Sequence, residues 1–429
     1  MTPATIAPPE TSSKPAQSAK LKVKHSWWQI CAQTAIVTVM AVLSLEIAFG
    51  IAGIGEEEYL KPDPVTGADG IPNKAVTFRK EGFGRFRYNS FGMQDVERSI
   101  NKPEGTLRIV CLGDSLTEAL QVDRKQNFCS VLQNELTGSN HRNCEVMNFG
   151  VSNSSIGQMY LRLKHKVWKF HPDVVALCIR PDSVYQLSPN PQGGFIYARP
   201  SFFLDAKGDL IEDMTVQRLW EKSKEGKRMR TTGWLREHSH IWGVISKGVE
   251  QFSAWLQQAK KGTAQWGADV TDKQTAFKSE VVPATTAPGP SLNVAPAALT
   301  SKTIPAKAPA VPVPAAPVTT APQKDRSYYD NATDYFWPTA RRLLQEIASE
   351  CDAHGAKLVI VRMPAYDGWR NSHETALLCQ SAARFHATFV DTQPAFEDAA
   401  KTKQLFFDAH MRAAGHKIVA DCMLKQLTR

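Results

Sequence analysis

The sequence predicts an α/β protein: a three-layer α/β/α domain with a five-stranded parallel sheet, an inserted helical cap with a disordered loop, and an N-terminal transmembrane helix. Three observations support this prediction. Short apolar runs alternate with amphipathic segments, as in parallel sheets that are covered on both faces. The stretch 26–45 carries no charge, and about 20 apolar residues suffice for a helix to cross a bilayer. A long, compositionally different insertion separates the third strand from the fourth.

The N-terminal region is expected to anchor the chain in a membrane. Residues 1–25 are rich in Pro, Ala, Thr and Ser and are predicted to be a disordered cytoplasmic tail. Residues 26–55 are predicted to be the anchor, with Trp27 and Trp28 in an aromatic belt. Lysines precede this span and glutamates follow it, which favours a cytoplasmic N-terminus. A cleaved signal peptide is the alternative, but its apolar core would be unusually long.

The rest of the chain follows the alternating pattern of one α/β domain. Residues 56–105 form a polar lead-in segment with little periodicity, and the domain itself is expected over 106–429. Strands are expected at 107–112, 144–149, 173–179, 357–361 and 388–391, and helices at 128–136, 156–170, 328–354, 374–385 and 413–427.

The insertion has two parts. Residues 183–280 are basic and rich in Trp, and apolar positions from Ile241 to Leu256 recur at helical spacing, which predicts a helical cap. A packed cap is favoured there over a sugar-binding platform. Residues 281–325 consist largely of Ala and Pro and are predicted to be an extended, disordered loop.

Charge and metal-ligand patterns exclude several function classes. The net charge is +9, but no basic patch interleaved with aromatic residues marks a nucleic-acid module. His238 and His240 lack a third ligand at metal spacing, so neither a metal nor another cofactor is expected. Cys129 and Cys144 flank a helix-to-strand connection, and the spacing leaves open whether they pair.

Ser115 is the candidate nucleophile. The segment 109–118 reads I-V-C-L-G-D-S-L-T-E, an apolar strand that ends at Gly-Asp-Ser and turns helical. Catalytic sites in parallel α/β sheets form at the carboxyl ends of the strands. An ordinary helix N-cap is the alternative role for a serine in this position.

Asp408 and His410 are the candidate partners of Ser115. They stand in F-D-A-H-M-R-A-A-G-H, directly before the last expected helix. A serine hydroxyl needs a histidine base, and the histidine needs a carboxylate that orients its ring. An Asp two residues before a His fits the second requirement, although a solvated surface turn is the alternative for the tripeptide alone.

Together these blocks resemble the SGNH (GDSL-type) hydrolase superfamily. The resemblance covers roughly 105–180 and 328–429, and includes N-F-G-V after the second strand. The lead-in R-Y-N-S-F-G-M-Q-D-V-E also resembles a segment of membrane-anchored bacterial members. No G-x-S-x-G is present, so the nucleophile elbow of α/β-hydrolases is not the match.

The resemblance implies residue roles. Ser115 would be the nucleophile, His410 the base and then the acid, and Asp408 its orienter. The oxyanion hole would use the N–H groups of Ser115 and Gly150. Members usually add an Asn after the third strand, where this chain has Pro181, which has no N–H to donate. Asn153 is the candidate substitute, with Arg180 as the alternative.

These roles imply an esterase or an O-acyl (acetyl) transferase or deacetylase. Its expected substrate is an acylated envelope or exported polysaccharide, and its expected location is the bacterial inner membrane, with the catalytic domain in the periplasm. The alternatives are a membrane-surface lipid esterase and a catalytically weak carbohydrate-binding or assembly component of an envelope pathway. The missing Asn favours the last alternative, and Ser115, Asp408 and His410 oppose it.

Overall fold

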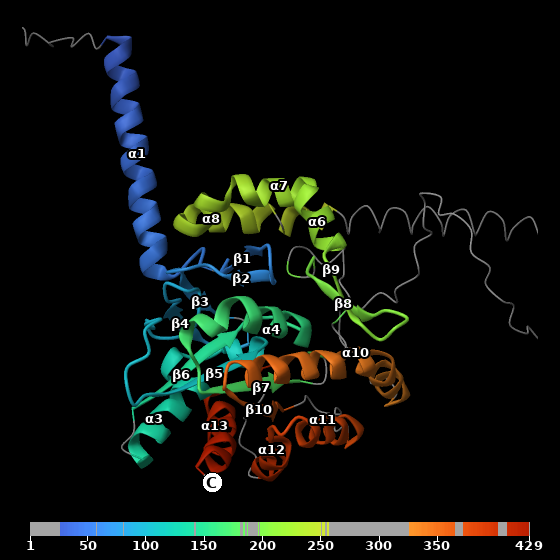
Figure 1. The fold of residues 1–429 in the computed structure, drawn as a ribbon. Coiled ribbons are helices and arrows are strands. Elements are labelled where there is room, and N and C mark those ends of the chain that lie inside the picture. Colours follow the sequence, from blue (N-terminus) through green and yellow to red (C-terminus); the bar gives the residue numbers. More distant parts are fainter. Residues whose placement is uncertain are drawn as a thin grey trace, which may run out of the picture.

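A computed structural model describes most of the chain outside its N-terminal tail and Ala/Pro-rich loop (Figure 1). The predicted disordered segments 1–25 and 281–325 lie outside the described residues, as do Pro181 and Asp408. The described residues are 26–56, 58–79, 81–140, 143–180, 183–184, 187, 196, 198–249, 251–253, 255–256, 326–364, 372–401 and 410–428.

The predicted five-stranded parallel sheet is confirmed. Its order is β11-β10-β7-β5-β6, so the first strand of the domain lies between the second and the third. Leu112 of the inner strand β5 lies opposite Phe149 on one side and Leu177 on the other. The strands are β5 (Leu107–Gly113), β6 (Cys144–Gly150), β7 (Val174–Ile179), β10 (Lys357–Arg362) and β11 (Thr388–Asp391).

Helices cover both faces of this sheet and complete the three predicted layers (Figure 1). Successive side chains of a strand point to opposite faces. Val110 and Leu112 therefore join the core on one face, and Ile109 and Cys111 join the core on the other. The first core includes α4 (Ile156–Arg162), α10 (Arg326–Ala353) and α11 (Ser372–Arg384); the second includes α3 (Phe128–Asn140), α12 (Gln393–Ala400) and α13 (Ala413–Leu427).

A single long helix, α1 (Trp27–Ala52), projects away from the domain (Figure 1). It is long and apolar enough to cross a membrane, and none of it is buried in the protein. Its last backbone carbonyls have no partners within the helix. Arg79 donates to the carbonyls of Ala52 and Gly53, and Arg85 donates to those of Gly50 and Ile51. These guanidinium groups therefore join α1 to the lead-in.

The lead-in is more regular than its sequence pattern predicts. It contains two antiparallel hairpins, β1 (Leu60–Asp63) with β2 (Gly67–Gly70) and β3 (Ala75–Phe78) with β4 (Gly84–Arg87). Each strand has four residues, which is too short for an alternating pattern to stand out. The part after β4 packs into the domain: Met93 joins the main core, and Gln94 donates to the carbonyls of Ala119 and Val122.

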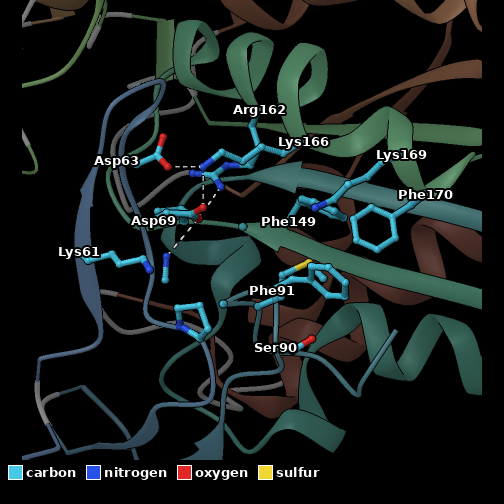
Figure 2. A pocket seen from close by; sticks show the side chains of 16 residues that line it. Lys61, Asp63, Asp69, Ser90, Phe91, Phe149, Arg162, Lys166, Lys169 and Phe170 are labelled. Atoms are coloured by element: carbon cyan, nitrogen blue, oxygen red, sulfur yellow. Dashed lines mark hydrogen bonds and ion pairs between the residues drawn. The ribbon is translucent and has the colours of Figure 1, made fainter. Parts of the chain in front are cut away.

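Ion pairs hold the β1–β2 hairpin against the helical layer (Figure 2). Arg162 donates to Asp69 at 2.6 Å, and Lys166 contacts both Asp63 and Asp69 at 2.6 Å. Burial opposes ionisation of Asp63, but Lys166 and hydrogen bonds from Thr66 hold the pKa of this carboxyl below its usual range. A one-turn π-helix at Leu163–Val167 follows α4 and carries Lys166.

The predicted cap is helical, but it begins with a hairpin. β8 (Ser201–Leu204) pairs with β9 (Leu210–Asp213), and α6 (Thr215–Lys222), α7 (Lys224–Thr231) and α8 (Gly233–His238) follow. A further helix runs over 240–256, of which 250 and 254 lie outside the described residues. Trp242 is half-buried, as a packed cap requires, whereas Trp255 is 60% exposed.

The two cysteines whose pairing the spacing leaves open do not form a disulfide. Cys129 and Cys144 are buried thiols that contribute to the core beside α3 and β6. The other described cysteines form no disulfide either. Burial raises the pKa of the Cys129 thiol, so this side chain behaves as a small apolar core residue.

Asp69→Ala is expected to destabilise the fold by about 3 kcal/mol, because it leaves the nearly buried Arg162 cation without its carboxylate. Chemical denaturation of the detergent-solubilised full chain measures this loss. Asp398→Ala is the control, because the Lys401–Asp398 pair is exposed and should contribute nothing measurable. Equal stability of the two variants would contradict the structural role of the Asp69 pair.

Candidate active site

Ser115 lies at the carboxyl end of the inner strand β5, where the short helix α2 (Ser115–Glu118) begins. Asp114 is the N-cap: its side chain accepts a hydrogen bond from the N–H of Leu116 at 3.0 Å. The second oxygen of Asp114 accepts a hydrogen bond from Nε of Arg180, at the end of β7, at 2.6 Å. The ends of two neighbouring strands are thus tied together beside Ser115.

His410 reaches Ser115 from the opposite end of the domain sequence. Its Nε2 lies 2.9 Å from the Ser115 Oγ, across a separation of 295 residues. The histidine side chain is 21% exposed, so solvent and a substrate can approach it. This distance is the one that a serine and its general base require.

The other ring nitrogen of His410, Nδ1, is hydrogen-bonded to the carboxylate of Glu81. Glu81 lies between β3 and β4 of the lead-in, and its side chain is 39% exposed. Glu81 is not among the predicted site residues, because it stands in a polar segment with no recognisable motif. Asp408, the predicted orienter, lies outside the described residues.

Gly113 allows α2 to sit close to the sheet. A Cβ at this position would lie 2.0 Å from the Thr117 Oγ1 and 3.2 Å from the Cys178 Cβ. Both neighbours are buried, so neither can move away. Glycine is therefore required by the close approach of the helical turn that carries Ser115.

The two predicted oxyanion donors, the N–H groups of Ser115 and Gly150, differ in whether they already donate a hydrogen bond. The Ser115 N–H has no acceptor among the described residues. The Gly150 N–H instead donates to the side-chain oxygen of Asn148 at 2.9 Å, and the Asn148 amide donates to the carbonyl of Thr117 at 2.8 Å. In this conformation the Gly150 N–H is therefore occupied by the Asn148 side chain and is not available to an oxyanion.

Asn153 lies in the turn after β6 with a φ of 64°, a left-handed conformation that Asn tolerates. Its side-chain amide donates to the carbonyl of Ile196 at 3.3 Å, and its own carbonyl accepts from Arg199. Its backbone N–H has no acceptor among the described residues. The turn is therefore fixed by its side chain and carbonyl, which leaves the N–H available.

A buried carboxylate holds that turn against α2. Glu118 is 1% exposed and accepts hydrogen bonds from the Tyr88 hydroxyl and from both the hydroxyl and the backbone N–H of Ser152. Burial raises the pKa of Glu118, and the hydrogen bonds from Ser152 and Tyr88 oppose this shift. Glu118 and Tyr88 lie within the sequence blocks that carry the family resemblance, but those blocks assign no role to either residue. In the structure the two residues join the lead-in, the turn that carries Ser115 and the turn after β6.

No group of three or more metal-ligating side chains occurs among the residues that the structure describes. A cavity of about 330 Å³ lies between the β1–β2 hairpin, residues 90–93 and residues 162–170 (Figure 2). Ser115, His410 and Glu81 are not part of its lining. Gly150 and Val151 do line it, so the cavity borders the turn after β6 but does not contain the Ser115–His410 pair.

No protein-family model and no curated protein matches this chain. Solved structures with a similar fold include LAE5, an α/β hydrolase from the metagenome of Lake Arreo, Spain, at 13% identity and a TM-score of 0.34, over 77% of this chain and 97% of LAE5. Axe2, an acetylxylan esterase from Geobacillus stearothermophilus, is 14% identical with a TM-score of 0.36, over 75% and 94%. TesA is 12% identical with a TM-score of 0.34, over 75% and 97%. Likenesses of this size do not assign an activity, which is argued from the site itself.

Beneath the site, His416 of α13 is buried and stacks on Phe128 with ring centroids 6.1 Å apart. Its Nδ1 has no hydrogen-bond partner in the described structure. Burial, and then the charge of His410, lower the pKa of His416 to about 3. This histidine is therefore a neutral packing residue at physiological pH.

The stability of the protein is expected to fall as the pH drops from about 6.5 towards 3, because the unfolded chain protonates His416 while the folded chain does not. Inside that window, His416 lowers the free energy of unfolding by about 1.4 kcal/mol for each pH unit of acidification. His416→Phe keeps the stacking on Phe128 and removes the titration. The loss of melting temperature between pH 7 and pH 5 should be smaller in the variant than in the wild type; equal losses would refute this assignment.

Proposed function

We propose that this chain is a serine hydrolase that cleaves or transfers esters, with Ser115 as nucleophile and His410 as general base and acid. The observation that carries the proposal is the 2.9 Å contact between the His410 Nε2 and the Ser115 Oγ, on a ring whose Nδ1 is held by a carboxylate. A serine hydroxyl is a poor nucleophile until such a base takes its proton.

The mechanism follows from these contacts. The Ser115 Oγ attacks the ester carbonyl as its proton moves to the His410 Nε2, and the carbonyl oxygen becomes an oxyanion. His410 then gives the proton to the leaving alcohol, and an acyl-Ser115 intermediate remains. Water or an acceptor alcohol, deprotonated by His410, attacks the acyl group, and the proton returns to Ser115.

The developing oxyanion needs hydrogen-bond donors placed in advance. The Ser115 N–H lacks an acceptor and is the first donor in this proposal. The Asn153 N–H is the second, in a turn that Glu118 fixes through Ser152. The Gly150 N–H serves only where Asn148 releases it.

The proposed substrate is an acylated polysaccharide of the cell envelope, with acetyl esters as the first choice. The resemblance to membrane-anchored SGNH hydrolases supports this proposal, as does the helix α1, which is long and apolar enough to cross a membrane. Lysines before α1 and glutamates after it support a cytoplasmic N-terminus and a periplasmic domain in a bacterial inner membrane. A catalytically weak binding or assembly component remains the second candidate, and the occupied N–H of Gly150 favours it.

Ser115→Ala is expected to abolish labelling of the full chain by a fluorophosphonate probe and to lower acetate release from aryl acetates by at least about 10³-fold, because the covalent step is lost. Glu104→Gln, in an exposed part of the lead-in, is the matched control and should behave as the wild type. Absence of labelling in the wild type, with equal acetate release in all three proteins, would favour the binding component.

The carboxylate that orients His410 can be identified by comparing Glu81→Gln with Asp408→Asn. We expect Glu81→Gln to lower kcat about 10²-fold or more with little change in KM, because the ring loses its anionic partner but the substrate contacts remain. The pH profile of kcat should also shift, which a purely structural role would not produce. Wild-type kinetics in Glu81→Gln together with a large loss in Asp408→Asn would assign the role to Asp408.

A further inference from the structure

The helix at 240–256 presents an apolar face to solvent. Ile245, Val249, Phe252 and Leu256 follow one another at intervals of four, three and four residues and are 50%, 48%, 60% and 40% exposed, and Trp255 is 60% exposed. This spacing places the four aliphatic and aromatic side chains on one side of a helix. A contiguous apolar face of this kind on a folded protein marks a site that binds another protein or a membrane.

The start of this helix is fixed to the outer end of α1. The Glu46 carboxylate of α1 accepts hydrogen bonds from the Ser239 hydroxyl and from the backbone N–H groups of His240 and Ile241. It therefore caps the 240–256 helix from another element, as an Asp N-cap does from within its own. A Cβ on Gly243 would lie 2.2 Å from the carbonyl oxygen of Gly55, so the two backbones touch there.

Further contacts make this placement rigid. Glu58, between α1 and β1, accepts hydrogen bonds from Ser246 at 2.7 Å and from Arg236 at 2.8 Å. Lys74 of the lead-in donates to the carbonyls of Arg236 and Glu237. The cap is thus attached to α1 through Glu46 and to the lead-in through Glu58 and Lys74.

Glu46 also sets the depth of the helix relative to a membrane. The uncharged stretch ends at Leu45, and twenty helical residues span about 30 Å, the thickness of the hydrocarbon core. Glu46 then lies at the outer boundary of this core, and the remaining turns of α1 cross the headgroup layer. In Figure 1 the cap helices α7 and α8 run across the direction of α1 and beside its lower part, above the hydrolase body.

The charge of the cap fits the same surroundings. Residues 214–249 contain eight Lys or Arg and three Glu, a net charge of +5. Arg218, Lys222, Lys227 and Arg230 are among the exposed ones. Basic side chains near an amphipathic helix attract anionic lipid headgroups, at about 1 kcal/mol for each residue near the surface.

We propose that the cap is a membrane-docking surface. The 240–256 helix lies in the outer interface of the bilayer that α1 crosses, with Ile245, Val249 and Phe252 against the acyl chains. The basic helices α6–α8 lie at anionic headgroups. This surface binds a lipid bilayer rather than a protein, and it holds the hydrolase body at the membrane independently of the chemistry at Ser115.

The test uses the full chain in nanodiscs that contain anionic phosphatidylglycerol. Cys31, Cys379 and Cys422, the thiols that are not fully buried, are replaced by Ser, and an environment-sensitive fluorophore is attached through Phe252→Cys. Lys207→Cys, on the exposed β8–β9 turn, is the matched control. Lipids with a nitroxide high on the acyl chain should quench the Phe252→Cys probe about threefold more than the control, because interfacial helices insert about 5–10 Å.

Equal quenching at the two positions would overturn the proposal. So would a disulfide between two copies of the unlabelled Phe252→Cys variant, together with no lipid quenching in the labelled one, which would assign the face to self-association. In nanodiscs of zwitterionic lipid only, quenching at Phe252→Cys should fall at least twofold, since the basic helices lose their partners. Undiminished quenching there would overturn the role of the anionic headgroups.

Discussion

The parallel pairing of β5 with both β6 and β7 is the constraint on which the site depends. An inner strand that is bonded on both edges cannot shift its register without breaking two ladders, so the position of Gly113 fixes where α2 begins. The carboxyl ends of β5, β6 and β7 then lie side by side, and the turns after them must converge. Asp114 and Arg180 bond across this edge, and Glu118 bonds to Ser152 beneath it. The sheet and the contacts at its edge thereby fix the position of Ser115.

The lead-in also fixes the positions of α2 and His410 in the candidate site. Tyr88 and Gln94 hold α2 from the side that the sheet does not cover, and Glu81 holds the ring of His410. The same segment also binds the end of α1 through Arg79 and Arg85. The lead-in is therefore a structural part of the catalytic domain rather than a spacer. Its removal with the anchor would expose buried polar groups such as Glu118, each of which costs free energy when it is left unpaired.

The sequence predicts those features of the fold that leave a local pattern. Buried parallel strands appear as apolar runs, and all five are correctly predicted; Gly-Asp-Ser and Asp-x-His identify Ser115 and His410 as candidates. Glu81 and Glu118 were missed because their roles arise from contacts between residues tens or hundreds of positions apart. The hairpins were missed because strands of four residues are too short to show an alternating pattern. No pattern in a polar turn distinguishes a carboxylate that meets a histidine from one that meets water. The N–H of Gly150 shows the same limit, since its bond to Asn148 depends on a side-chain orientation.

The β3–β4 hairpin has a further consequence for the proposed reaction, because it contacts both α1 and His410, the proposed base. Arg79, directly after β3, and Arg85 of β4 donate to carbonyls at the end of α1, and Glu81 between them binds His410. A turn of a few residues thus separates the end of α1 from His410. If α1 crosses a bilayer, as proposed above, this connection holds the candidate site close to the membrane. An ester presented at the membrane surface, on a chain that is still being exported or attached to lipid, would then reach Ser115 more readily than an ester in the distant layers of an envelope.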